Sequence, residues 1–279
     1  MKKLILWDLD GTLIDSLEDL GEAVNKALGL RALPLLQKED FRKMVGHGVR
    51  NLVKQALETA AARVPGAAAG VPATPGAAVP ESPATPFSDA EIDAALADFK
   101  AYYSSHIDVH TRPYPGMPEL LSELAAAGVK MAVVSNKFQE GTERLIREFF
   151  PGIDFVAILG NGPGRPLKPS PEIVEEVLRS APDAIDRADA LLVGDSPTDM
   201  RTASNGGIAS IAVSWGYRSR EELAAALAET AALAHAPAAL VETAALAGSS
   251  HTHASLAPAA HALPIADSVE ELRSLISAS

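Results

Sequence analysis

The chain contains no cysteine. Disulfides, thiolate metal sites and a cysteine nucleophile are therefore excluded. Basic residues are also few relative to acidic ones, with 24 Lys and Arg against 36 Asp and Glu, which gives a formal net charge of −12 at pH 7. Because nucleic-acid backbones attract cations, this balance argues against a nucleic-acid partner, although a local site can still hold a small phosphorylated molecule.

The sequence also lacks a long hydrophobic run. No stretch approaches the roughly 18 uncharged apolar residues that a membrane-spanning helix needs. Met1, Lys2 and Lys3 are followed by only four apolar residues before Asp8, which is too short for the core of a secretory signal. We therefore expect a cytoplasmic protein with no membrane partner.

Hydrophobic residues nevertheless make up 47% of the chain, enough to form a core. Short apolar runs predict buried strands at residues 4–7, 129–134, 153–159, 190–193 and 208–213. Helical patterns fall between these runs, so we predict an α/β fold, a doubly wound parallel sheet with a Rossmann-like core. In such sheets the chemistry lies beyond the carboxyl ends of the strands.

The first two predicted strands are separated by about 120 residues, far more than one crossover helix needs. Helical patterns occupy residues 16–28, 38–45, 49–63 and 88–105 of this interval. We therefore predict a helical cap domain over residues 16–111, inserted in a discontinuous core of residues 1–15 and 112–279.

Two segments are biased in composition. Residues 64–86 are rich in Ala, Pro and Gly, which predicts a flexible loop within the cap. Residues 229–263 are rich in Ala and contain four of the seven histidines, His235, His251, His253 and His261. Their irregular spacing, without a carboxylate cluster, favours a solvated low-complexity insert over a metal-binding tract.

Two pairs of carboxylates follow predicted strands. Residues 8–16, after the first strand, read DLDGTLIDS and contain Asp8 and Asp10, and residues 194–199 read GDSPTD and contain Asp195 and Asp199. Like charges held this close repel each other unless a cation lies between them. Neighbouring parallel strands would bring the four carboxylates to one edge, where a donor set of oxygens alone favours a hard cation such as Mg2+.

Two further segments carry groups that suit a phosphate. Ser135, Asn136 and Lys137 end the second predicted strand, where a hydroxyl and the backbone N–H groups of a turn can bind phosphate oxygens. Lys168 lies between prolines in RPLKPSP, and a fixed ammonium there would reduce the repulsion between the carboxylates. Lys137 is a weaker candidate, with its side chain expected to point into solvent.

These four segments, in this order along the chain, resemble the motifs of the haloacid dehalogenase superfamily in its Mg2+-dependent phosphatase branch. The resemblance covers residues 4–217 apart from the loop at 64–86. Within that family, the segments 111–116, 134–137 and 215–218 look like those of phosphoglycolate phosphatases.

The resemblance implies a role for each residue. Asp8 is expected to be the nucleophile that forms an aspartyl-phosphate, and Asp10 the general acid and then the base that activates water. Mg2+ is expected to bind the Asp8 carboxylate, the Asp10 backbone carbonyl and Asp195. Asp199 either lies just beyond the metal's ligands or orients Lys168. The phosphoryl group is expected to contact Thr12, Ser135, Asn136 and Lys168.

The same resemblance implies that the cap closes over the site, excludes water until the aspartyl-phosphate forms, and recognises the substrate. The segment 46–50, GHGVR, places His47 between glycines at a break between helices. Arg50 could pair with a substrate carboxylate. An ordinary turn between helices with a surface arginine explains this segment equally well.

The resemblance predicts a phosphomonoester hydrolase that acts on a small phosphorylated metabolite, 2-phosphoglycolate foremost, as a monomer or homodimer. A phosphosugar mutase of the β-phosphoglucomutase type would use the same Asp8 and Asp10 but return the phosphoryl group to a sugar. A phospho-acceptor signalling module also combines clustered aspartates with a lysine and Mg2+, but it lacks a cap and places its acceptor after a middle strand.

Overall fold

The computed structural model describes residues 2–64, 87–182, 184–234 and 264–279. The predicted loop at 64–86 lies almost entirely outside the described residues. So does most of the predicted low-complexity insert at 229–263, including His235, His251, His253 and His261.

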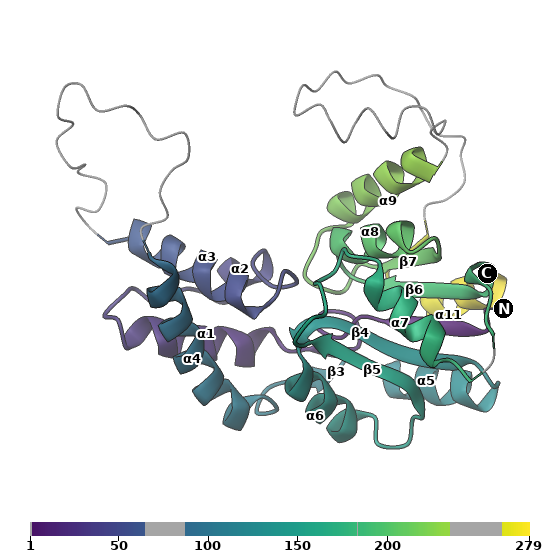
Figure 1. Ribbon diagram of the computed structural model, residues 1–279, viewed down its shortest axis with the longest axis horizontal. Coiled ribbons are helices and arrows are strands. Elements are labelled where there is room, and N and C mark those ends of the chain that lie inside the picture. The colour runs from purple at the N-terminus through teal and green to yellow at the C-terminus, as the bar shows by residue number, and fades with distance from the viewer. Residues whose placement is uncertain (1, 65–86, 183, 235–263) are drawn as a thin grey trace.

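A six-stranded parallel sheet forms the centre of the fold (Figure 1), in the order β5-β4-β1-β6-β7-β8. Its strands are β1 (Leu4–Trp7), β4 (Lys130–Phe138), β5 (Phe155–Asn161), β6 (Ala190–Gly194), β7 (Ala209–Val213) and β8 (Ile265–Ala266). The predicted α/β fold is therefore confirmed, and each of the five predicted strands is present. β8 was not predicted, because two residues are too short to give a strand pattern.

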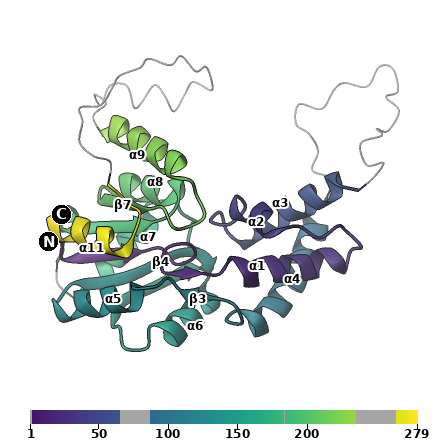
Figure 2. The same cartoon turned by 180° about the vertical axis from the view of Figure 1, so that it is seen from behind.

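Each face of the sheet is covered by helices (Figures 1 and 2). Alternate side chains of β1 divide between the two sides: Ile5 and Trp7 join one apolar cluster, and Leu4 and Leu6 join another, as the two-residue repeat of a strand requires. The first side is covered by α5 (Met117–Ala126), α6 (Gln139–Phe149) and α11 (Val269–Ala278). The second is covered by α7 (Glu172–Ser180), α8 (Pro197–Asn205) and α9 (Arg220–Ala234).

In the described part of the chain, four helices form an insert between two short strands that precede α5 and β4. Two short antiparallel strands, β2 (Ile14–Asp15) and β3 (Arg112–Pro113), form the connection. The helical insert consists of α1 (Leu17–Gly29), α2 (Lys38–Arg42), α3 (Val49–Ala62) and α4 (Asp89–His106). Figures 1 and 2 show it at the end of the sheet opposite the two termini, so the carboxyl ends of the parallel strands face the insert.

Helix α2 is shorter than the predicted stretch of residues 38–45. The backbone turns after Arg42, and Gly46 has a positive φ of 107°, a conformation that favours glycine. The carbonyl oxygens of Arg42, Lys43 and Val45 accept hydrogen bonds from the side chain of Arg218, far along the chain. These carbonyls therefore need no continued helix to be satisfied.

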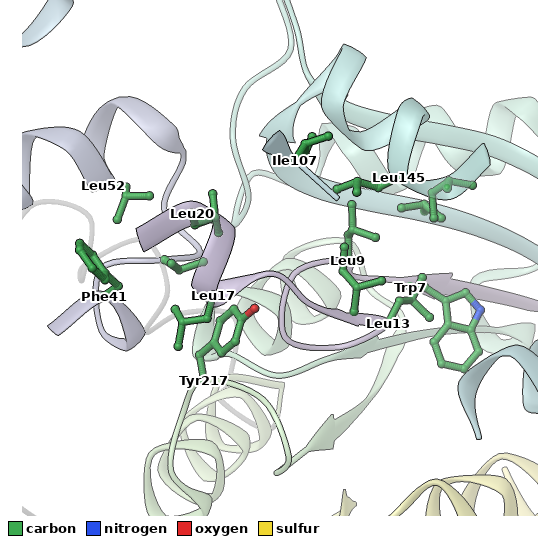
Figure 3. Close-up of a cluster of buried hydrophobic side chains, with 14 of the residues drawn as sticks. Trp7, Leu9, Leu13, Leu17, Leu20, Phe41, Leu52, Ile107, Leu145 and Tyr217 are labelled. Carbon is green, nitrogen blue, oxygen red and sulfur yellow. The ribbon is translucent and has the colours of Figure 1, made fainter. Parts of the chain in front are cut away.

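The insert and the sheet share one apolar cluster (Figure 3). It runs from Trp7 and Leu145 beside the sheet, through Leu9 and Leu17, to Phe41 on α2. Buried Asp19, on α1, joins the start of the insert to its end. Its carboxylate accepts bonds from the backbone of His110 and from the backbone and hydroxyl of Thr111, at 2.6–3.0 Å. Among the described residues, no helix is long and apolar enough to cross a membrane.

Candidate active site

Asp8 lies directly after β1, at the middle of the sheet. Its backbone N–H donates to Val193 at 2.9 Å, and the next turn is closed by a bond from Gly11 N to Ile14 O at 2.9 Å. Gly11 has a φ of +90°, and a side chain there would collide with the carboxylate of Asp195. The glycine therefore allows the loop after β1 to lie against the loop after β6.

Three carboxylates meet at this edge. Ligand oxygens of Asp8, Asp195 and Asp199 all lie within 4.8 Å of one another, and all three residues are buried. β1 and β6 are neighbouring parallel strands, with Trp7 opposite Val193. The strand register therefore places the residues that follow these two strands side by side.

Burial dominates the electrostatics of this cluster. It raises the pKa of Asp8 to about 7, against the opposing effect of Lys168 and with a further increase from Asp199. Burial, followed by repulsion from Asp8 and Asp199, raises the pKa of Asp195 well above its usual range. Burial and mutual repulsion therefore disfavour the ionised forms of Asp8 and Asp195, and a cation bound between them would favour those forms.

Lys168 supplies one positive charge. Its Nζ donates to Asp8 Oδ1 at 2.7 Å, to Asp199 Oδ1 at 2.6 Å and to the Val134 carbonyl at 2.9 Å. Burial by itself would lower the pKa of this lysine, but the carboxylates of Asp199 and Asp8 outweigh that effect and raise it. The side chain therefore stays protonated at physiological pH.

The remaining negative charge fits a divalent cation. Three carboxylates face one ammonium, and all the available ligand atoms are oxygens, which suits Mg2+. Asp195 Oδ2 accepts the N–H of Tyr217 at 2.6 Å. Both oxygens of Asp199 are engaged, one by Lys168 and the other by the hydroxyl and N–H of Ser196. Asp199 thus holds Lys168 in place.

Asp10 is not part of this group of three carboxylates, and its side chain has other partners. Oδ1 accepts the hydroxyl of Ser16 at 2.5 Å, and both carboxylate oxygens accept Lys137 Nζ, at 3.0 and 3.1 Å. The expectation that Lys137 points into solvent is wrong, because its side chain is only 3% exposed. Strand β4 continues to Phe138, with a register shift against β5, and this irregular end directs Lys137 inward.

A single cavity of about 40 Å³ connects these groups, and we call it the site cavity. On the side of the sheet it is lined by Asp8, Asp10, Ser135, Lys137, Lys168 and Asp195. On the side of the insert it is lined by Leu20, Val49, Leu52, Phe99 and Tyr103. One water needs roughly 10–15 Å³ on this scale, so the cavity suits a small ligand.

Of the residues predicted to bind phosphate, Ser135, Asn136 and Lys168 line the site cavity. Thr12 is fully buried, with its Oγ1 3.5 Å from Asp8 Oδ2. The side chain of Asn136 bonds backbone groups of the protein in this structure. Its amide donates to the carbonyls of Gly46 and Lys168 and accepts the N–H of Lys168. Asn136 therefore fixes the Lys168 loop and links it to the insert. Both side-chain N–H groups of Asn136 are used in these two contacts.

Arg50, predicted to pair with a substrate carboxylate, has two aspartates of the insert as its partners in this structure. Its guanidinium pairs with Asp89 and Asp93 at 2.7 and 2.8 Å, and its side chain is 44% exposed. Arg50 and His47 line a second cleft between the insert and the core, to which the core contributes Phe138 and Arg165. His47 Nδ1 lies 3.4 Å from Thr198 Oγ1, and burial, followed by Arg218, lowers the pKa of His47.

Three residues at the site carried no separate prediction. Tyr103, on α4, accepts a bond from Lys137 Nζ at 2.8 Å. Tyr217 donates its backbone N–H to Asp195, and Arg218 bonds the carbonyls that follow α2. Tyr217 and Arg218 belong to a segment quoted for its resemblance, 215–218, whereas Tyr103 looks in the sequence like an ordinary apolar-face residue of a helix.

Comparison with known proteins agrees with this geometry. The family model of the haloacid dehalogenase-like hydrolases matches residues 5–213. The chain is 33% identical over 219 residues to a phosphoglycolate phosphatase of Mesorhizobium japonicum, covering 78% of this chain and 86% of that protein. A phosphoglycolate phosphatase of Rhodospirillum rubrum is 34% identical over 225 residues, covering 80% of this chain and 84% of that protein.

A solved structure shows the same similarity. The crystal structure of a provisionally assigned phosphoglycolate phosphatase from Lactobacillus delbrueckii subsp. bulgaricus has a TM-score of 0.69 and 34% identity, covering 81% of this chain and 92% of that chain. The matched family region contains Asp8, Ser135, Lys168 and Asp195. The chain therefore belongs to the haloacid dehalogenase-like hydrolase family and is a phosphatase of that family.

Proposed function

We propose that this phosphatase hydrolyses the phosphate ester of a small acidic metabolite, 2-phosphoglycolate, through an aspartyl-phosphate on Asp8 and with Mg2+ as its cofactor. Two relatives with about a third of their residues identical to this chain are phosphoglycolate phosphatases. The small volume of the site cavity supports a substrate of few atoms.

In the first step, a carboxylate oxygen of Asp8 attacks the phosphorus atom and the bond between phosphorus and the ester oxygen breaks. The ester oxygen keeps the electron pair and takes a proton from Asp10. The attack brings an anion toward a phosphate dianion, so the positive charge around the reacting groups largely sets the activation free energy. Lys168, 2.7 Å from Asp8, supplies a fixed positive charge at this point.

In the second step, a water molecule gives a proton to Asp10 and attacks the phosphorus atom of the aspartyl-phosphate. The bond to Asp8 breaks, inorganic phosphate leaves and both aspartates return to their initial state. Ser16 and Lys137 both bond the Asp10 carboxylate, so its position is fixed for both proton transfers.

Asp8, the Asp10 backbone carbonyl and Asp195 would hold the Mg2+. Bound there, the cation would neutralise charge on the phosphoryl oxygens. The raised pKa values of Asp8 and Asp195 support this assignment, because burial without a cation disfavours their ionised forms.

We also propose that residues 16–111 act as a cap on a core formed by residues 1–15 and 112–279. Side chains of the insert form one wall of the site cavity. Asn136 and Arg218 hold the segment between α2 and α3 through its carbonyls. A closed cap keeps bulk water from the site, and it must open to admit substrate.

One observation carries the proposal: Asp8, Lys168 and Asp195 converge on a single buried cavity that Asp10 also lines. Release of inorganic phosphate from a panel of small phosphorylated metabolites tests it. We expect the highest kcat/KM with 2-phosphoglycolate, loss of activity with EDTA and recovery with Mg2+. Asp8→Asn should lower kcat by at least about 1,000-fold, whereas Asp154→Asn, an exposed control, should not.

The panel also includes β-glucose 1-phosphate, with and without a sugar bisphosphate. Isomerisation of this sugar phosphate without release of inorganic phosphate would identify a mutase and contradict the proposal. Stable phosphorylation of the protein without turnover of any substrate would identify a signalling module instead.

A further inference from the structure

Lys137 occupies an unusual position for a lysine. Its ammonium is buried between Asp10 of the core and Tyr103 of the insert, donating to both Asp10 oxygens at 3.0 and 3.1 Å and to the Tyr103 hydroxyl at 2.8 Å. It also lies 4.9 Å from the centre of the Tyr103 ring, within range of a cation–π contact. Burying an ammonium is costly unless it is well paired, and here Asp10 and Tyr103 supply the partners that hold it beside the cavity.

Of the described residues around the site cavity, three carry a fixed positive charge, Lys137, Lys168 and Arg218. Lys168 bonds Asp8 and Asp199, on the side where the phosphoryl group is transferred. Arg218 donates to three backbone carbonyls after α2. Lys137 is therefore the cation on the side of Asp10, where the leaving group departs.

The distances allow Lys137 to reach the organic part of the substrate. An ester oxygen that takes a proton from Asp10 lies about 2.7 Å from its carboxylate. Lys137 Nζ is 3.0 Å from the same carboxylate, so the ester oxygen and Nζ are at most about 6 Å apart. A carboxylate whose carbon is two bonds from the ester oxygen extends about 3–4 Å from that oxygen, which brings it within hydrogen-bonding distance of Nζ.

The rest of the wall around the leaving group is apolar. Leu20, Val49, Leu52 and Phe99 form it on the side of the insert, and Tyr103 contributes a hydroxyl that already accepts from Lys137. An apolar wall strengthens the attraction between an ammonium and an anion. None of these four apolar side chains carries a charge that could pair with an anionic group on the substrate.

We propose that Lys137 selects substrates that carry a carboxylate next to the phosphate ester, and that Tyr103 of the insert positions its ammonium for this contact. The proposal rests on the proposed function, since it treats Asp10 as the residue beside the leaving group. To the proposed function it adds Lys137 as the residue that binds the organic part of the substrate. Because Tyr103 belongs to α4, the contact is complete when the insert lies against the core.

Steady-state kinetics of the full chain with saturating Mg2+ test this proposal. The two substrates are 2-phosphoglycolate and 2-hydroxyethyl phosphate, which has the same length but a neutral end. The selectivity ratio is kcat/KM for the first divided by kcat/KM for the second. We expect Lys137→Met to lower this ratio about 10- to 100-fold, as expected for the loss of a charge-assisted hydrogen bond.

Two further variants complete the test. Tyr103→Phe keeps the ring and removes the acceptor, so we expect a smaller fall in the ratio, about 3- to 10-fold, mainly through the KM for 2-phosphoglycolate. This variant also serves if Lys137→Met does not fold. Lys130→Met, an exposed lysine at the start of the same strand, should leave the ratio unchanged.

The outcomes separate this proposal from the proposed function. If Lys137→Met lowers kcat/KM equally for both substrates, selection of the carboxylate by Lys137 is overturned while the phosphatase activity stands. The same conclusion follows if Tyr103→Phe is the only variant that folds and leaves the ratio unchanged. If the wild-type protein hydrolyses both substrates with equal kcat/KM, then the assignment of 2-phosphoglycolate fails, and the role of Lys137 fails with it.

Discussion

The ammonium of Lys168 lies 2.7 Å from the carboxylate of Asp8, although 160 residues separate them in the chain. Both side chains are almost fully buried. The pair therefore depends on the whole sheet, because β1 positions Asp8 and the loop before α7 positions Lys168. We expect the Lys168 ammonium to neutralise negative charge beside Asp8.

Lys168→Met should lower kcat for phosphate release by about 100- to 1,000-fold, the usual effect of removing one charge-stabilising group from an active site. Asp8 and Asp199 would lose their shared cation, so thermal stability should also fall at neutral pH. Steady-state kinetics and a melting curve measure both effects, with Lys130→Met as the control. A kcat within twofold of wild type would show that Lys168 does not neutralise the transferring group.

The pH dependence of stability should reveal the acidic cluster. The pKa of Asp8 is raised from 3.8 to about 7 in the folded protein, so the native state binds a proton more readily than the unfolded state. In EDTA, the melting temperature should therefore fall as pH rises from about 4 to about 7, because over this interval the unfolded carboxyl is ionised while the native one still holds its proton. Mg2+ binds the ionised carboxylates, so its stabilising effect should grow over the same range.

Asp8→Asn should reduce both of these trends, whereas Asp154→Asn, at an exposed position away from the cluster, should retain them. Differential scanning fluorimetry at several pH values, with EDTA or with Mg2+, measures them. Equal stabilisation by Mg2+ at both ends of the range would argue against metal binding by these carboxylates.

Gly216 should tolerate no side chain. A Cβ at this position would overlap the side chain of Asp195 and the backbone oxygen of Gly11. Gly216→Ala should therefore displace Asp195, at a cost of about 1–3 kcal/mol in the free energy of unfolding. The Mg2+ concentration for half-maximal activity should rise at least about tenfold. Gly152→Ala is the control, because a Cβ there has no atom within 4 Å. Unchanged Mg2+ dependence in Gly216→Ala would mean that Asp195 can move without loss of the metal.

Arg218 should hold the insert against the core. Its guanidinium donates to the carbonyls of Arg42, Lys43 and Val45, and the residue is only 8% exposed. Arg218→Ala should increase amide hydrogen exchange in residues 42–48 and raise KM, lowering kcat/KM about tenfold. Arg201→Ala, which removes an exposed pair with Glu229, should change neither. Exchange at the wild-type rate in residues 42–48 of Arg218→Ala would exclude this role.

Most of the sheet could be predicted, because a strand that is buried on both faces needs a continuous apolar run. Residues 4–7 and 190–193 are such runs, and both strands begin at the predicted residue. Strand β8 has two residues and no pattern. The end of α2 could not be predicted because it depends on Arg218, which lies more than 170 residues further along the chain.

The sequence alone determined the kinds of chemistry available. Carboxylates that follow apolar strands, one proline-bounded lysine and the absence of cysteine already indicated oxygen ligands suited to a cation and a positive charge suited to a phosphate. These features are local in the chain, so they can be read without coordinates. The tertiary structure decided which polar groups meet. It turned Lys137 inward to Asp10, paired Arg50 with two aspartates of the insert and bonded the Asn136 side chain to the Lys168 loop. Such pairings depend on strand register and on how the insert packs against the sheet.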